Sequence, residues 1–406
     1  MSNTLKFGNG EWYGKEGTIL AYNDENNNYK PLPFTFDRDS VATRVNKQGL
    51  IETVGADQPR IDYLNDSNGA LLLEPSRTNL IQYSNFSSGW DLLSGGSIAY
   101  NQTVSPDGTQ NASVLSGNGV NGNAVYDALN LSVQSYTLSV FAKQKSVSII
   151  SFEGFTSGAL GLSKFNLSNG TIETASSNQF SDEKIEDYGN GWYRCSVKLT
   201  PTSSGIKFFG FKGGDSDSGE LFSLYGAQLE VGSYPTSIIN TKGSAVTRLA
   251  DVCNNGANEQ VINSTEGVFY AEISTNTDAT DKTISLNNGV IGSLNNRLWI
   301  GYSTSAKRVY ALGYVNNTLQ FVLSKLMTDE TAFVKIACKY SLNNVSFFVN
   351  GEKVGTDTSA LAFTQLNSID FNIGNGSEVA KFYGKTKDVR VYNTTLTDQE
   401  LIALTS

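Results

Sequence analysis

Histidine is absent from the 406 residues of the chain. Its imidazole is the commonest general base near neutral pH and the commonest protein ligand of transition metals. A Ser-His-Asp hydrolase, a Cys-His protease and a zinc site built on imidazole are therefore excluded. The chemistry that remains is that of carboxylates, hydroxyls, amides and aromatic rings.

Charge is also scarce, because Asp, Glu, Lys and Arg make up 17% of the chain and the net charge is −9. Lys and Arg form no cluster or stripe of the kind that neutralises phosphates, so we exclude nucleic acid as a partner. Polarity comes mainly from Asn, Ser, Thr and Gly, which suit turns and the solvent-facing sides of strands.

The three cysteines are Cys195, Cys253 and Cys338. They are far apart and odd in number, so we expect no disulfide framework. Cys195 and Cys338 each alternate with apolar residues and are predicted to be small buried side chains. This usage fits assembly in a reducing cytoplasm.

Long apolar runs are missing, and no stretch approaches the ~20 residues that a membrane-spanning helix needs. The first residues, MSNTLKFGNGEW, lack the charged start and apolar core of a secretory signal. We therefore expect neither insertion into a membrane nor export by the general secretion route.

Aromatic residues are abundant at 11%, and apolar residues alternate with polar ones in many short segments separated by Gly, Asn, Ser and Asp. This pattern predicts an all-β protein with tandem antiparallel β-sandwich (jelly-roll) domains and an irregular N-terminal strand and loop region. The expected parts are a lead-in over residues 1–80, a first sandwich over 81–250 and a second over 251–406.

Local signals support particular elements of this prediction. Asn350-Gly351 between two apolar runs predicts a hairpin with a type I′ turn. Thr397 followed by Glu400 predicts a capping box that opens one short helix. We expect strand faces made by Tyr136, Leu138, Val140 and Ala142, and by Tyr225, Ala227, Leu229 and Val231.

Three stretches resemble known families. FTFDRDSVATRVNKQGLIETVGADQPRIDY with GALLLEPSRTNLI (residues 34–81) is similar to a cassette of bacteriophage virion proteins. YGAQLEVGSYPTSII with GSAVTRLAD (225–251) resembles the closing strand of their carbohydrate-binding-module-like domain. FFVNGEKV and VRVYNTTLTDQEL near the C-terminus resemble the concanavalin A-like (laminin-G-like) lectin superfamily.

The resemblance implies a virion appendage such as a tail fibre, head fibre or capsid decoration protein, assembled in the host cytoplasm and released by lysis. Its partners would be other virion proteins and host-surface glycans, and a homo-oligomer, preferably a trimer, is expected. We predict a noncatalytic protein that presents lectin-like domains for adhesion. A purely structural decoration protein and a polysaccharide depolymerase are the alternatives.

Glycan binding needs an aromatic face beside amides or carboxylates, although any one such ring can instead fill a core. The candidates are Trp90 and Tyr126 in the first sandwich, and Trp299, Tyr302 and Tyr310 in the second. Glycoside cleavage needs two carboxyl groups flanking the bond. The E-x-D-x-x-E arrangement of catalytic concanavalin A-like glucanases is missing, so we expect no enzymatic activity.

Two further sets of charged residues have open interpretations. Asp215, Asp217 and Glu220 lie in the loop GGDSDSGE, which is either a weak calcium site or a plain polar hairpin; no other cofactor is expected. The cassette residues form either an attachment interface or surface salt bridges of small energy. They are Arg38, Arg44, Arg60, Glu74 and Arg77.

Overall fold

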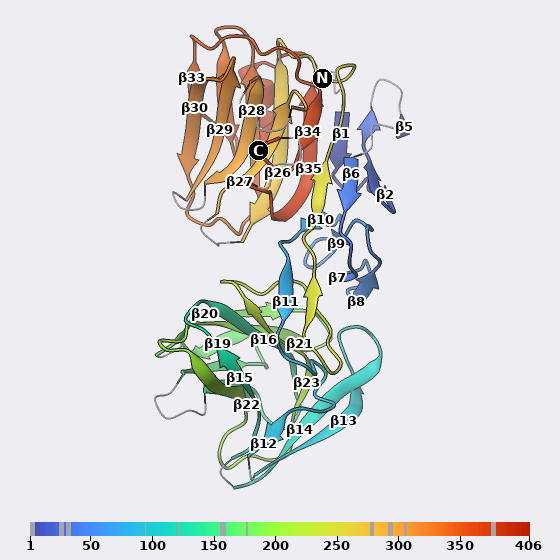
Figure 1. The fold of residues 1–406 in the computed structure, drawn as a ribbon, viewed down its shortest axis with the longest axis vertical. Coiled ribbons are helices and arrows are strands. Elements are labelled where there is room, and N and C mark those ends of the chain that lie inside the picture. The colour runs from blue at the N-terminus through green and yellow to red at the C-terminus, as the bar shows by residue number, and fades with distance from the viewer. Residues whose placement is uncertain are drawn as a thin grey trace. The chain divides into compact units, whose positions relative to one another are not determined.

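The computed structural model describes most of the chain, and Figure 1 shows its elements. The described residues are 5–23, 28–29, 34–93, 95–120, 122–154, 160–175, 178–276, 280–290, 295–303, 307–374 and 379–406. Within them the only helix is α1 (Asp398–Thr405), and every pair of adjacent strands in the sheets is antiparallel. The prediction of an all-β fold built from antiparallel sheets is confirmed. No described helix is long and apolar enough to span a bilayer.

The chain forms two compact units, and neither is continuous in sequence. The first unit contains residues 1–41, 54–75 and 249–406, whereas the second contains residues 42–53 and 76–248. Residues 1–80, which we expected to form a separate lead-in, are thus divided between the two units. The second unit is inserted, in sequence, within the first.

The first unit is a sandwich with a ten-stranded and a five-stranded sheet, accompanied by a four-stranded sheet. The ten-stranded sheet runs β33 (Glu352–Asp357), β32 (Val345–Val349), β31 (Val334–Tyr340), β26 (Gly267–Thr275), β35 (Gly384–Tyr392), β1 (Leu5–Gly8), β4 (Tyr22–Asn23) and β5 (Asn28–Tyr29), with β10 (Ala70–Leu73) on β35 and β9 (Ile61–Asp62) on β10. The five-stranded sheet runs β30 (Thr318–Leu326), β29 (Arg308–Val315), β28 (Arg297–Ser303), β27 (Lys282–Asn287) and β34 (Ser368–Asp370). The four-stranded sheet runs β2 (Tyr13–Lys15), β3 (Thr18–Leu20), β6 (Phe34–Asp37) and β25 (Val252–Asn254).

Alternating residues of the two larger sheets of this unit fill one core between them. Strand β26 contributes Phe269 and Ile273, and β28 contributes Leu298 and Ile300, all fully buried. Cys338 lies in the same core as a free thiol, as its alternation predicted. Burial raises the pKa of this thiol, so it has no thiolate character at neutral pH.

Strands from the N-terminal part of the chain pair with its last strand, β35, in the ten-stranded sheet. Strand β1 pairs with β35 in the register Leu5 to Val391, and β10 pairs with β35 in the register Leu71 to Thr386. In Figure 1 the blue β1 lies beside the red β35. Leu5, Phe7 and Leu71 are buried in the core of the sandwich. The N-terminal segment is therefore part of the sandwich itself.

The predicted hairpin and helix of this unit are both confirmed. Asn350 has φ of 48° and Gly351 has φ of 77°, which are the two positive values that a type I′ turn requires. At α1 the Thr397 side chain accepts a hydrogen bond from the Glu400 backbone N–H at 3.3 Å. The Glu400 carboxylate accepts one from the Thr397 N–H at 2.8 Å, which completes the capping box.

The second unit is a sandwich of two six-stranded sheets. One runs β12 (Asp91–Leu92), β15 (Ala124–Leu131), β22 (Gly205–Lys212), β17 (Ile149–Gly154), β18 (Leu162–Asn166) and β19 (Thr171–Thr174). The other runs β13 (Gly96–Val104), β14 (Gln110–Asn118), β23 (Ser218–Val231), β16 (Tyr136–Gln144), β21 (Trp192–Leu199) and β20 (Phe180–Asp187). Two short pairs join β11 (Arg77–Asn79) to β24 (Val246–Arg248), and β7 (Ala42–Val45) to β8 (Ile51–Val54).

Its core follows the predicted alternation except in one strand. Tyr136, Leu138, Val140 and Ala142 all enter the core, as does the free thiol of Cys195. Strand β23 instead carries an irregularity, where β16 shifts its pairing from Gln228 to Tyr225. The shift changes which side chains face inward, since a bulge displaces the alternation by one residue. Ala227 and Leu229 enter the core as predicted, whereas Tyr225 lies beyond the shift and does not share their face. Val231 is 42% exposed.

Candidate functional site

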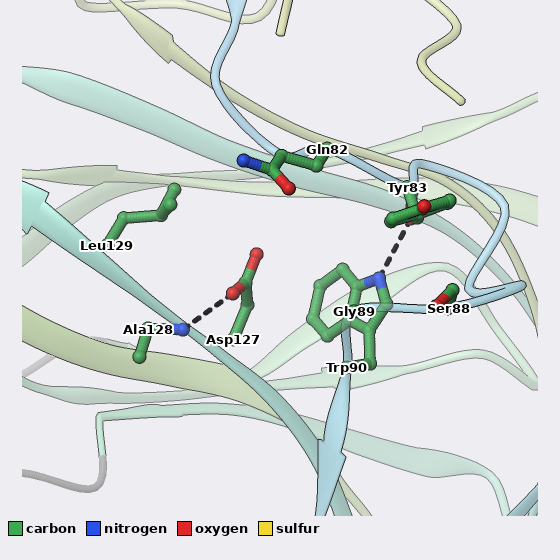
Figure 2. A pocket seen from close by; sticks show the side chains of 8 residues that line it. All are labelled: Gln82, Tyr83, Ser88, Gly89, Trp90, Asp127, Ala128 and Leu129. Carbon is green, nitrogen blue, oxygen red and sulfur yellow. Dashed lines mark hydrogen bonds between the residues drawn. The ribbon is translucent and has the colours of Figure 1, made fainter. Parts of the chain in front are cut away.

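A small hollow of about 130 Å³ opens in the second unit, between the middle of β15 and the segment after β11. Figure 2 shows the carboxylate of Asp127 projecting into the space between Leu129 and the indole of Trp90. The volume suits part of one sugar ring or one substituent, since whole small-molecule sites are usually several times larger. The lining residues are Gln82, Tyr83, Ser88, Gly89, Trp90, Asp127, Ala128 and Leu129.

Trp90 is held in place on two sides and half-buried. Its indole N–H donates a 2.8 Å hydrogen bond to the Tyr83 carbonyl, and its ring lies 4.6 Å from that of Phe86 and 5.8 Å from that of Phe211. An indole fixed in this way keeps its orientation without a ligand, so little conformational entropy would be lost on binding. Of the five aromatic rings predicted to bind glycans, Trp90 is the one that lines this hollow.

The turn that presents Trp90 depends on Gly89. Its φ is +73°, in the left-handed region that favours glycine, and a Cβ there would lie 2.8 Å from Cδ2 of Tyr83. Any side chain at position 89 would therefore displace the Tyr83 ring from the edge of the hollow.

Asp127 is the acidic residue of the hollow, and it was not among the predicted site residues. It is half-buried, and the Ala128 N–H donates a 2.7 Å hydrogen bond to Oδ1. Within the part of the chain that the structure describes, Oδ2 has no hydrogen bond from the protein. Burial raises the pKa of this carboxyl above its usual value, and the charge of Asp91 adds to the rise. A detectable signal was there, because Asp127 alternates with Val125 and Leu131 on an otherwise apolar strand face.

Tyr126 does not belong to this hollow. It is adjacent to Asp127 on β15, so its side chain points to the opposite face of the strand. Its ring is half-buried and lies 6.2 Å from that of Phe208. The structure therefore does not bring Trp90 and Tyr126 together in one binding surface.

Tyr302 and Tyr310, predicted to bind glycan, are core residues of the first unit. Tyr302 is 0% exposed and its hydroxyl donates to the Ile273 carbonyl at 3.1 Å. Tyr310 is 7% exposed and its hydroxyl lies 2.6 Å from that of Thr283. Neither ring has a free face on which a sugar could stack, so both predictions are wrong. For Tyr302, the alternation of the sequence LWIGY already placed its ring with the apolar Leu298 and Ile300.

Trp299 is the candidate of this unit that is not fully buried. Its side chain is half-buried, its N–H donates to the Ile373 carbonyl at 3.0 Å, and its ring lies 5.5 Å from that of Tyr314. The neighbouring Arg297 is 2% exposed and its guanidinium donates to the Ile373 and Val290 carbonyls. Trp299 is therefore a packed ring with one partly accessible side and is a second candidate.

The three carboxylates considered for calcium each have a different partner. Asp215 pairs with Lys212 at 2.6 Å and Glu220 pairs with Lys145 at 2.6 Å. Asp217 accepts a 2.6 Å hydrogen bond from the Gly214 N–H within its own turn. Among the described residues no three acidic or cysteine side chains are arranged to hold a metal ion. Each carboxylate thus has a partner within the unit, and a calcium site in this loop stays a prediction.

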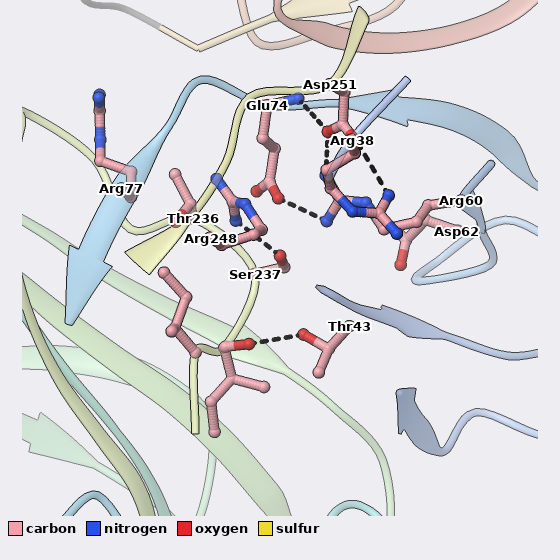
Figure 3. A network of polar contacts seen from close by, with 12 residues as sticks. Arg38, Thr43, Arg60, Asp62, Glu74, Arg77, Thr236, Ser237, Arg248 and Asp251 are labelled. Atoms are coloured by element: carbon pink, nitrogen blue, oxygen red, sulfur yellow. Dashed lines mark hydrogen bonds and ion pairs between the residues drawn. The ribbon is translucent and has the colours of Figure 1, made fainter. Parts of the chain in front are cut away.

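Cassette residues of the first unit form a buried ionic network, part of which Figure 3 draws. Asp251 accepts hydrogen bonds from Arg38 at 3.0 Å, from Arg60, and from the Glu74 backbone N–H at 2.8 Å. Arg60 also pairs with the Glu74 carboxylate at 2.6 Å. Arg38 and Arg60 are at most 1% exposed. The predictions of an attachment interface and of surface salt bridges are both wrong for these residues, because the protein interior surrounds them.

Cassette residues of the second unit have local partners there. Arg44 pairs with Glu52 at 2.6 Å, and both side chains are partly exposed. Arg77 lies 3.8 Å from the buried Glu230 carboxylate and 5.7 Å from the centre of the Tyr234 ring. An attachment role for Arg44 stays a prediction.

Part of the first unit is similar to a known superfamily. Residues 268–402 match the model of the concanavalin A-like lectin/glucanases superfamily, of the laminin G type. This match covers strands of both larger sheets of that unit and the first part of α1. These residues are therefore similar in sequence to concanavalin A-like sandwich domains. No curated protein matches the chain.

Solved structures similar to about a third of the chain include sialidase-associated domains. The CBM40 of the Ruminococcus gnavus IT-sialidase shares 23% identity over 35% of this chain and 84% of its own, with a TM-score of 0.31. The leech intramolecular trans-sialidase shares 20% identity over 35% of this chain and 23% of its own, with a TM-score of 0.30. A SAP-like pentraxin from Limulus polyphemus shares 11% identity over 35% of this chain and 70% of its own, with a TM-score of 0.26.

Proposed function

We propose that this protein is a noncatalytic adhesive protein that binds glycans. The observation that carries the proposal is the match of residues 268–402 to a superfamily of lectins and glucanases on a sandwich with a filled core. The hollow of the second unit supplies the kind of surface that sugars use. It combines an indole face, which can stack on the C–H groups of a sugar, with an amide and a carboxylate, which can form hydrogen bonds with its hydroxyls.

The lining of the hollow favours binding over cleavage. Hydrolysis of a glycosidic bond uses two carboxyl groups about 5–9.5 Å apart on either side of the bond. Asp127 is the one carboxylate among the described residues that line the hollow. Asp91 influences its pKa from the neighbouring strand β12 but does not line the hollow. A depolymerase would need a second acid within the site.

The proposed setting is a bacteriophage particle, on which the protein is a fibre or decoration protein. The resemblance of residues 34–81 to the virion cassette supports this setting. Many copies on one particle would make weak glycan contacts effective through avidity. Its partners there would be capsid or tail proteins, and a trimer is the preferred oligomer. A decoration protein without glycan binding is the alternative.

A glycan array probed with the full chain tests the proposal. We expect weak binding by the wild type, reduced at least tenfold by Trp90→Ala and retained by Trp299→Ala if the hollow is the site. Thermal unfolding of each variant shows whether it remains folded. A folded wild type that binds no glycan would favour the decoration protein, and release of reducing sugar from a host capsule would favour the depolymerase.

A further inference from the structure

We propose that the hollow at Trp90 selects sugars by charge: it accepts a sugar that presents an ammonium or hydroxyl group to Asp127, and it rejects a sugar that carries a carboxylate. This inference rests on the proposed function, because it assumes that the hollow binds glycans. It specifies the class of sugar that the hollow takes.

The hydrogen-bonding capacity of the hollow requires a donor on the ligand. An ionised carboxylate can only accept hydrogen bonds. Asp127 Oδ1 already accepts the Ala128 N–H at 2.7 Å, whereas Oδ2 has no hydrogen bond from the residues that the structure describes. A ligand that placed a second carboxylate here would leave Oδ2 facing another acceptor. A hydroxyl satisfies Oδ2, and an ammonium group satisfies it with a charge-assisted bond, which is the stronger kind.

The charge that lines the hollow acts in the same direction. No Lys or Arg is among its eight lining residues, and the charge of Asp91 extends to Asp127. Lys242 is exposed and pairs with Tyr83 through an isolated bridge, but it does not line the hollow. Lys207 lies across the strand pair from Leu129 and donates its ammonium to Ser203. An entering anion therefore meets a half-buried carboxylate, and no cation, among the described residues that line the hollow.

Trp90 strengthens this selectivity. The face of an indole ring attracts cations through its quadrupole as well as stacking on sugar C–H groups. In Figure 2 the indole and the Asp127 carboxylate both border the same space. An amino sugar bound there could contact the ring with its apolar face and the carboxylate with its ammonium group.

Three monosaccharides with the same ring provide the test, measured by titration of the full-length protein at about pH 6, where an amino sugar is protonated and a uronic acid is ionised. The probes are glucosamine, glucose and glucuronic acid, with charges of +1, 0 and −1. We expect glucosamine to bind at least about tenfold more tightly than glucuronic acid, with glucose between them. Asp127→Asn should reduce the difference between the charged sugars to less than about threefold.

The control variant is Asp182→Asn, which removes one acidic charge from the same unit. Asp182 lies on β20, pairs with Lys198 and has φ of 52°, a conformation that Asn adopts readily. It should keep the full order of the three sugars. Circular dichroism and thermal unfolding show that both variants are folded.

The outcomes separate the two proposals. Equal affinity for the three sugars, tighter binding of glucuronic acid, or an order unchanged in Asp127→Asn would overturn charge selection while leaving glycan binding intact. Failure of all three sugars to bind the folded wild type would reject glycan binding at the hollow, and with it this inference.

Discussion

Single buried polar side chains hold the N-terminal cassette in place. The Asn79 amide donates to the Ala227 and Ile239 carbonyls at 3.1 and 2.9 Å, and its carbonyl accepts from the Leu229 and Ile81 N–H groups, both at 3.1 Å. All four partners are backbone groups of the second unit. The side chain of Asn79 therefore supplies a hydrogen bond to each of these four groups. The motif RTNL that marks the cassette thus has a structural role at Asn79.

Asn79→Ala should destabilise the second unit by at least about 3 kcal/mol, because it leaves several buried backbone groups unpaired. Chemical denaturation followed by fluorescence measures the loss. Asn169→Ala, at an exposed turn of the same unit, is the matched control and should change stability by less than about 0.5 kcal/mol. Similar stabilities for the two variants would contradict this account.

Asp251→Ala should destabilise the first unit by about 3–5 kcal/mol, because Arg38 and Arg60 would lose a common acceptor inside the protein. Glu352→Ala removes the exposed pair of Glu352 with Lys325 in the same unit and should cost at most about 1 kcal/mol. Thermal unfolding of the two variants compares them directly. A loss for Asp251→Ala no larger than for Glu352→Ala would show that the buried network contributes little.

The burial of a residue is predictable from the sequence where alternation decides it, and poorly predictable where the residue is charged. Cys195 and Cys338 were predicted to be buried because their neighbours at intervals of two are apolar. Arg38 and Arg60 gave no such signal, since a charged residue beside Asp37 or Asp62 resembles an exposed ion pair. Their burial depends on Asp251, which is about two hundred residues away in sequence and could not be paired with them beforehand.

At the level of single elements, the residues within a turn or a helix cap are sufficient to predict that turn or cap. The Asn350-Gly351 turn and the Thr397 cap each depend on residues within a few positions, so the sequence contains all the information required. The shift in β23 was not predictable, because the pairing of β16 against Tyr225 and Gln228 produces it. Pairing partners in a sheet are set by tertiary structure.

Thr397→Ala should lower the stability of α1 by about 1 kcal/mol, because the Glu400 N–H loses its side-chain acceptor. Faster hydrogen exchange of the amides at the start of α1 measures this effect. Thr397→Ser keeps the hydroxyl and should retain slow exchange. Equal exchange in the Ala and Ser variants would mean that packing of Leu401 alone fixes the helix.

At the level of the whole molecule, each unit combines segments that are distant in sequence. The predicted boundary near residue 250 corresponds to the return of the chain into the first unit at residue 249. The role of the first residues as sheet strands could not be foreseen, because short runs such as LKFG carry no record of which strand they will pair with. The hollow could not be foreseen for the same reason. Trp90 was identified as a candidate by itself, but its position beside Asp127 depends on the tertiary structure.

Residues 249–406 expressed alone should fail to form a native sandwich, although they contain the whole superfamily match. They lack Leu5, Phe7, Phe36, Leu71 and Leu73, which are buried in the core. We expect binding of a hydrophobic dye and no cooperative thermal transition, in contrast to the full chain. A cooperative transition like that of the full chain would show that the N-terminal strands are dispensable.

The pairing of β1 and β10 with β35 also sets an order of events during synthesis. The ribosome makes residue 5 more than 380 residues before its partner Val391, so the edge of β1 that pairs with β35 lacks its partner while those residues are made. All residues of the second unit are complete by position 248 and can fold while the first unit is still being made. Throughout that interval the early strands expose apolar side chains and unpaired edges. Synthesis speed and chaperone supply should therefore govern the yield of native protein more strongly than they would for two sandwiches encoded one after the other.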